Sequence, residues 1–219
     1  MEKTFVEYAA AFYNDNQRDN SSNLQWEHCY KSFYVARKND SLSINFLSLN
    51  LAFYLASWGM YRGSSFLTKY DHQIHIPVIE EILKKDYDVL LGIKCSDYDA
   101  DKLVSLIELQ NAIKAVYSKK SEFQRPISKI LVTKILLGTL GCVPAYDRYF
   151  EKAIRYNGFK NYSCNTKSIN ELKLFYNKYE NEIEISRKKM IIQGTYIEYP
   201  QMKYLDMVFW QMGKDLERN

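Results

Sequence analysis

Glycine and proline are scarce in this chain, and that scarcity limits the folds open to it. Eight glycines and four prolines make up roughly 5% of the 219 residues, against about 12% in average proteins. Sandwiches, propellers and disordered linkers need many more turn-forming residues than this. The sequence therefore predicts an all-α protein, a compact multi-helix domain.

Hydrophobic side chains are numerous enough to build one substantial core. They make up 47% of the chain, which suits a single helical domain over residues 1–219, or two lobes in which a basic segment, 112–167, faces a cleft. Apolar residues recur with the spacing of helices in several stretches. The predicted helices are 2–16, 22–37, 42–60, 100–118, 168–190 and 200–217. The segment 192–199 could be extended.

The cysteines and the apolar stretches indicate a cytoplasmic protein without a metal. The four cysteines contain no Cys-x-x-Cys pair and no histidine at zinc-finger spacing, so we expect reduced thiols and neither metal nor cofactor. The start of the chain lacks the pattern of a signal peptide. The most apolar stretch, 42–60, contains several serines and asparagines and is typical of a buried helix rather than a membrane span.

Positive charge is concentrated in one part of the chain. The segment 112–167 contains eleven Lys and Arg residues against three acidic ones, so it carries +8 although the whole chain carries only +4. Clustered cations of this kind bind phosphates irrespective of base sequence. The distribution predicts DNA as a partner.

Asp147 lies within the basic segment, where a buried helix ends at a glycine-rich turn and a new helix begins. Free backbone amides at a helix N-terminus favour a carboxylate, so Asp147 is either a structural cap or a functional group. Lys134, thirteen residues earlier, falls on the apolar stripe of the preceding helix. A lysine there needs a partner, which Asp147 could supply, unless its ammonium reaches the surface.

The segment 57–65 ends the apolar helix with Trp58, Arg62 and two serines that could line a pocket. Arg62 suits a phosphate or carboxylate, or else one of the chain's own acids. A row of small residues at 52, 56, 59 and 63 would let another backbone approach that helix. His75 is either an acid–base group or a hydrogen-bonding loop residue.

The stretch Val143-Pro144-Ala145-Tyr146-Asp147-Arg148-Tyr149-Phe150 resembles the catalytic segment of the helix-hairpin-helix DNA glycosylases. The resemblance covers about 30 residues and places Asp147 at the catalytic aspartate, which stabilises the cationic sugar or activates water. It also places Lys129 near the lysine that forms a Schiff base in bifunctional members, whereas Lys134 does not match that position. The family's Leu-Pro-Gly-Val-Gly hairpin signature is absent before Lys129.

The first functional hypothesis is therefore a helix-hairpin-helix DNA glycosylase-like enzyme that removes a damaged or modified base. Its candidate catalytic residues are Asp147, Lys134 and Lys129. Its candidate base-pocket or substrate-binding residues are Trp58, Tyr61, Arg62, His75, Tyr146 and Tyr149. Its candidate DNA-backbone residues are Lys119, Lys120, Arg125, Arg148, Lys152 and Arg155.

Two other hypotheses fit the same residues. One is a non-enzymatic helical module that binds DNA or protein and uses Asp147 only as a cap. The other is a small-molecule enzyme that combines Arg62, His75 and Asp147 in one pocket. The base recognised, the choice between repair and defence against foreign DNA, and the oligomeric state stay open.

Overall fold

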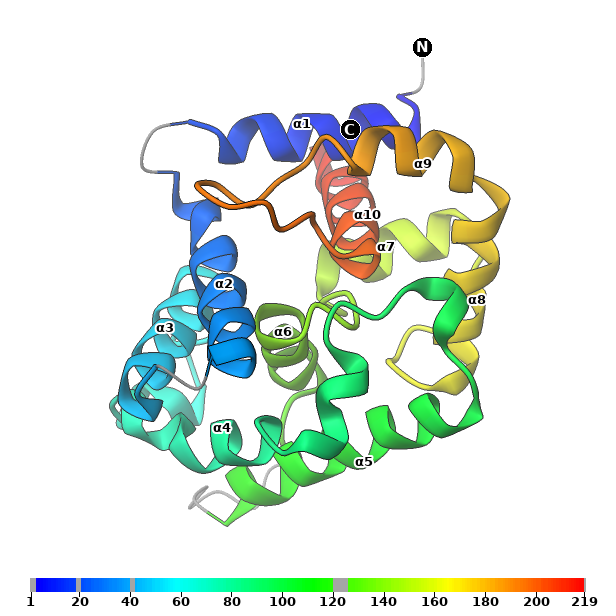
Figure 1. Ribbon diagram of the computed structural model, residues 1–219. Coiled ribbons are helices and arrows are strands. Elements are labelled where there is room, and N and C mark those ends of the chain that lie inside the picture. The colour runs from blue at the N-terminus through cyan, green and yellow to red at the C-terminus, as the bar shows by residue number, and fades with distance from the viewer. Residues whose placement is uncertain (1–2, 19–20, 40–41, 120–125, 219) are drawn as a thin grey trace.

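The computed structural model describes residues 3–18, 21–39, 42–119 and 126–218 (Figure 1). All the secondary-structure elements within these residues are helices. The prediction of an all-α protein is confirmed for this part of the chain. The α-helices are α1 (Phe5–Asn16), α2 (Gln25–Asn39), α3 (Ile44–Ser57), α4 (Ile76–Ile82), α5 (Ala100–Ser118), α6 (Lys129–Thr139), α7 (Arg148–Tyr156), α8 (Thr166–Lys178), α9 (Glu180–Arg187) and α10 (Gln201–Arg218). No helix in the described ranges is both long and apolar enough to cross a membrane.

Side-chain oxygens begin many of these helices. Thr4 forms a capping box with Glu7 at α1, and Ser43, Asp99 and Asn165 cap α3, α5 and α8. Such caps satisfy amides that have no partner inside the helix. In these four helices a side chain in the local sequence therefore marks where the helix begins.

The core is built around α6, which is buried from Leu131 to Thr139 and lies in the middle of the molecule (Figure 1). Helices α2 and α3 pack on α6, and α10 packs against α7 and α1. The buried apolar side chains form one cluster that includes residues from all ten α-helices described. Because that cluster is continuous, α6 and α10 hold residues close together that are far apart in the sequence.

Two expectations about the helices are wrong in detail. The segment 168–190 forms two helices, α8 and α9, which meet at Tyr179. The row of small residues is not a packing face, because Ala56 and Gly63 are exposed and α3 ends at Ser57. In the segment 192–199, the chain forms one isolated bridge, between Ile191 and Glu198.

The close approaches occur at other glycines. A Cβ at Gly138 of α6 would lie 2.4 Å from the Tyr54 ring, and one at Gly213 of α10 would lie 2.0 Å from the carbonyl oxygen of Tyr149. Gly213 therefore lets α10 touch the backbone at the start of α7. Gly141 adopts a φ of +61° in the turn after α6 and leads the chain toward Asp147.

Candidate functional site

Asp147 is the N-cap of α7 and is buried. Its Oδ1 accepts hydrogen bonds from the backbone amides of Tyr149, at 3.1 Å, and Phe150, at 3.2 Å. One carboxylate oxygen thus satisfies two amides that the helix leaves free. The other oxygen, Oδ2, faces α6.

Lys134 of α6 lies next to that second oxygen. Its Nζ is 3.7 Å from Asp147 Oδ2 and donates a hydrogen bond of 2.8 Å to the carbonyl oxygen of Trp58. The side chain of Lys134 is only 7% exposed, so its ammonium does not extend into solvent. The structure therefore brings Lys134 and Asp147 together and ties Lys134 to the residue that ends α3.

A second buried pair, Lys203 with Asp206, lies beside the first and was not anticipated. The Lys203 Nζ is 2.9 Å from Asp206 Oδ2, and Asp206 Oδ1 accepts a 3.0 Å hydrogen bond from the Ala145 amide. The Lys203 ammonium also lies over the rings of Phe12 and Trp26, 4.7 and 5.0 Å from their centroids. The signal was present in the sequence, since a charged i, i+3 pair falls on the apolar stripe of the predicted helix 200–217.

Burial moves both members of the Lys134–Asp147 pair toward their neutral forms. It raises the pKa of Asp147, and the nearby Asp206 acts in the same direction, whereas Lys134 opposes the shift. It lowers the pKa of Lys134, and the charge of Arg62 adds to that lowering. Groups with shifted pKa values are common at functional sites and in structural ion pairs alike.

The space between the two pairs is very small. A void of about 10 Å³ lies there, which is room for about one water molecule. It is lined by Tyr54, Trp58, Lys134, Leu137, Ala145, Asp147, Lys203, Asp206 and Trp210. A nucleobase does not fit this void in the described conformation.

Of the aromatic residues predicted for a base pocket, some lie near this void and others do not. Trp58 lines the void and contacts the Trp210 ring edge-on. Tyr149 packs against the same tryptophan with a centroid distance of 5.3 Å. Tyr146 does not line the void, because its ring is buried against Phe150 and its hydroxyl bonds Ser168.

Tyr61 and His75 belong to a separate network. The Nε2 of His75 is 2.7 Å from the Tyr61 hydroxyl, and its Nδ1 is hydrogen-bonded to the Tyr117 hydroxyl. The His75 ring is fully buried, and burial lowers its pKa to about 3. His75 lines neither the void at Asp147 nor the larger pocket described below, so the structure does not unite it with Asp147.

Lys129 lies at the exposed start of α6. Its Nζ is 2.6 Å from Glu151 Oε1 and donates to the Tyr162 carbonyl at 3.1 Å. Lys129 is not part of the void that Asp147 lines. The described geometry therefore provides no shared reaction site for Lys129 and Asp147.

The predicted DNA-backbone residues that are described all lie on the surface. Arg148, Lys152 and Arg155 are exposed on α7, and Lys119 is exposed at the end of α5. Lys120 and Arg125 lie outside the described residues.

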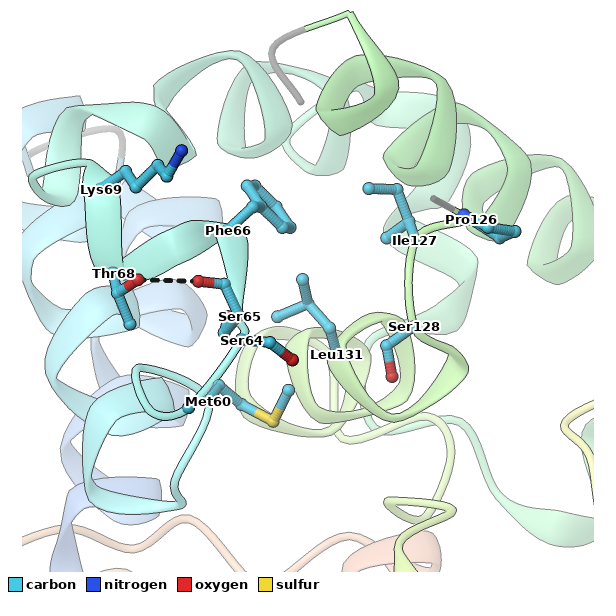
Figure 2. Close-up of a pocket in the computed structure, with 11 residues that line it drawn as sticks. Met60, Ser64, Ser65, Phe66, Thr68, Lys69, Pro126, Ile127, Ser128 and Leu131 are labelled. Carbon is cyan, nitrogen blue, oxygen red and sulfur yellow. Dashed lines mark hydrogen bonds between the residues drawn. The ribbon is translucent and has the colours of Figure 1, made fainter. Parts of the chain in front are cut away.

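A larger pocket, of about 470 Å³, lies between segments 60–69 and 126–131 (Figure 2). Figure 2 shows Phe66 and Ile127 on opposite sides of it, with Leu131 between them. Ser64 and Ser65 contribute to its wall, and its volume is typical of small-molecule sites. Arg62 does not line this pocket; its guanidinium lies against Gly59.

Comparison of the chain with protein-family models, with curated proteins and with solved structures gives no match.

Proposed function

We propose that the protein binds nucleic acid through the exposed face of α7, and that Asp147 is a structural group beneath that face. The observation that carries the proposal is the spacing of Arg148, Lys152 and Arg155. They lie at positions i, i+4 and i+7 of one helix, which is a single face, and all three are exposed. A row of cations on a rigid helix suits the phosphates of a nucleic-acid backbone.

The present partners of these cations are weak competitors for phosphate. Arg148 lies 3.3 Å from Glu217, and the two side chains are 70% and 40% exposed. Lys152 donates to the Leu216 carbonyl, and Arg155 lies over the Tyr162 ring. Exposed ion pairs contribute only about 0–1 kcal/mol, so exchanging the Arg148–Glu217 pair for a phosphate contact costs little.

The role assigned to Asp147 rests on how its carboxylate is occupied. One oxygen holds two amides of α7 and the other faces Lys134. The adjoining void takes about one water. This arrangement favours the non-enzymatic hypothesis over an enzyme with a base pocket already open at Asp147.

The test is the salt dependence of binding to a labelled DNA duplex, followed by fluorescence anisotropy. Each phosphate contact contributes about −0.9 to the slope of log K against log salt. Replacing Arg148, Lys152 and Arg155 together with glutamine should make that slope shallower by up to about 2.7 and weaken binding at low salt.

A matched control removes the same charge elsewhere. Arg18, Lys84 and Lys102 each form an ion pair with an acid three residues away, and none lies on α7. Their triple glutamine variant should bind like the wild type. If both triple variants lose the same binding affinity, the loss comes from net charge and not from the face of α7. A wild-type protein that binds no duplex would refute the proposal.

A second candidate function is hydrolysis of an N-glycosidic bond, as the glycosylase resemblance implies. One observation favours it: a void with room for a single water adjoins Asp147, whose pKa burial raises. In that reaction Asp147 would take a proton from water while the water oxygen bonds the sugar carbon. The carbon–nitrogen bond would break, and its electron pair would leave with the base.

The two candidates separate in one experiment. Duplexes carrying normal, damaged and modified bases are incubated with the wild type and with Asp147→Asn, and abasic sites are counted. Asparagine still caps a helix, so the fold should persist. Base release that disappears in Asp147→Asn supports hydrolysis, and unchanged release excludes Asp147 as the catalytic group. Borohydride trapping tests Lys129 and Lys134 separately for a Schiff base.

A further inference from the structure

A groove of about 420 Å³ lies on another part of the molecule, between α2, the turn at 91–94 and the segment 196–201. Its lining is rich in tyrosine, the residue whose abundance, 19 of 219, the site at Asp147 does not explain. The lining residues are Tyr30, Tyr34, Leu91, Gly92, Lys94, Arg187, Tyr196, Ile197, Glu198, Tyr199, Pro200 and Gln201.

One wall of the groove continues an aromatic row that starts in the core. Trp26, Tyr30 and Tyr34 follow one another at four-residue spacing along α2. The rings of Trp26 and Tyr30 are stacked, with centroids 5.2 Å apart, and the Tyr34 ring lies 6.2 Å beyond. The buried end fixes the row, so Tyr34 presents a positioned aromatic ring to the groove.

The Tyr30 hydroxyl is an unused polar group at the groove. Tyr30 is 2% exposed, and its hydroxyl forms no hydrogen bond with the residues that the structure describes. The hydroxyl oxygen is not one of the fully buried polar atoms that lack a partner, so it is in contact with solvent, and Tyr30 lines the groove. A Cβ at Gly92 would lie only 3.1 Å from this hydroxyl, so a glycine there keeps the approach to it open. The hydroxyl is therefore available to a ligand.

The groove is also lined by an exposed ring, that of Tyr196. Tyr196 is 99% exposed and lies two residues after Gly194, whose φ is +70°. A fully exposed aromatic side chain contributes nothing to the core, whereas it suits contact with a planar ligand.

One cation at the groove has no acidic partner among the described residues. Lys94 is exposed and forms no ion pair within the described ranges. Arg187 is buried in the wall, where Glu184 and Glu198 both bind its guanidinium. Arg187 offers one positive charge to these two carboxylates, so Lys94 is the cation at the groove that remains free to bind a negatively charged group.

We propose that this groove binds a nucleotide. The base lies against Tyr34 and Tyr196, a polar atom of the base or sugar bonds the Tyr30 hydroxyl, and the phosphate lies at Lys94. Stacking on aromatic rings next to cations is how proteins bind unpaired bases without sequence preference. The nucleotide is either free or part of a single strand, and this proposal does not depend on the duplex-binding face of α7.

The experiment measures anisotropy of a short fluorescein-labelled oligothymidylate, with AMP and UMP as unlabelled competitors. Tyr196→Ala and Tyr34→Ala should each weaken binding at least about fivefold, as loss of one stacking partner does. Tyr30→Phe removes only the unpartnered hydroxyl and should weaken binding about two- to tenfold. Its melting temperature should equal that of the wild type, because no protein contact is lost.

Phe53→Ala is the matched control, since Phe53 is 58% exposed on α3 and does not line the groove. It should bind like the wild type. Competition by the mononucleotides identifies a free nucleotide as a ligand, and binding of the oligomer alone identifies a single strand. The proposal is overturned if the wild type binds neither, or if the Tyr30, Tyr34 and Tyr196 variants all bind as it does. The Arg148, Lys152 and Arg155 variant should retain this binding even if duplex binding fails.

Discussion

Replacing Lys134 with methionine tests the buried pair directly. Methionine keeps the length of the side chain but removes the ammonium. Asp147, whose side chain is 13% exposed, then loses its cation, and the Trp58 carbonyl loses its donor. Removing one partner of a buried ion pair costs about 3–5 kcal/mol. Asp147 keeps its two amide hydrogen bonds, so we expect about 3 kcal/mol, a large part of the stability of a domain.

Adding Asp147→Asn to this variant should restore stability. Asparagine is neutral, so no unpaired charge remains buried, and its side-chain oxygen can still cap α7. We expect the double variant to be about 1–2 kcal/mol more stable than Lys134→Met alone. Two independent sites would instead give additive losses.

The loss of stability in Lys134→Met should also depend on pH. Lys134 lowers the pKa of Asp147 against the effect of burial, so its removal raises that pKa further. A carboxyl with a raised pKa in the folded state favours folding when protonated, and its cost grows as pH rises above the unfolded value of about 3.9. The defect of Lys134→Met should therefore be large at neutral pH and shrink as the pH falls toward 4.

Urea unfolding, followed by tryptophan fluorescence at neutral and acid pH, measures the stability of the wild type, Lys134→Met and the double variant. The reasoning fails if Lys134→Met costs less than about 1 kcal/mol at neutral pH. It also fails if the defect is independent of pH, or if the asparagine substitution adds a second loss.

Two further predictions concern the packing of α10 and the network at His75. Gly213→Ala should lower the free energy of unfolding by about 1–3 kcal/mol, because the new Cβ would lie 2.0 Å from the Tyr149 carbonyl oxygen. A rise in melting temperature, which this substitution gives at exposed helix positions, would contradict this packing. His75 should stay neutral through mildly acid pH in an NMR titration, since burial lowers its pKa to about 3. The unfolded chain binds that proton below about pH 6.5, so His75 should reduce stability as pH falls from 6.5 toward 3. Titration near 6.5 in the folded protein would contradict the burial of His75.

Local pattern predicted the helices well, but it could not predict which charges meet. The cap at Asp147 follows from its position before α7, and the apolar stripe of α6 already put Lys134 among buried residues. The contact of Lys134 with Trp58 joins residues 76 positions apart. No periodicity within a helix specifies a contact at that separation.

In the candidate site too, the sequence indicated individual residues but not which of them lie together. The resemblance to the glycosylases singled out Asp147 and Lys129, but in the structure Lys129 pairs with Glu151 on the surface. The sequence places Lys203 and Asp206 on the apolar stripe of one helix, but it does not place them beside Asp147, because that helix lies more than fifty residues later. They reach Asp147 only because Gly213 lets α10 pack against the start of α7.

The amino-acid sequence by itself determined that this protein is helical, where most of its helices lie, and that about a quarter of it is strongly basic. Those properties depend on residues a few positions apart, whose spacing is fixed by the geometry of a helix. The tertiary structure decided that Asp147 is buried and paired, that His75 lies elsewhere, and that Tyr30 and Tyr34 border a groove. Those properties depend on how helices far apart in the chain pack, which is set by the fit of the whole core.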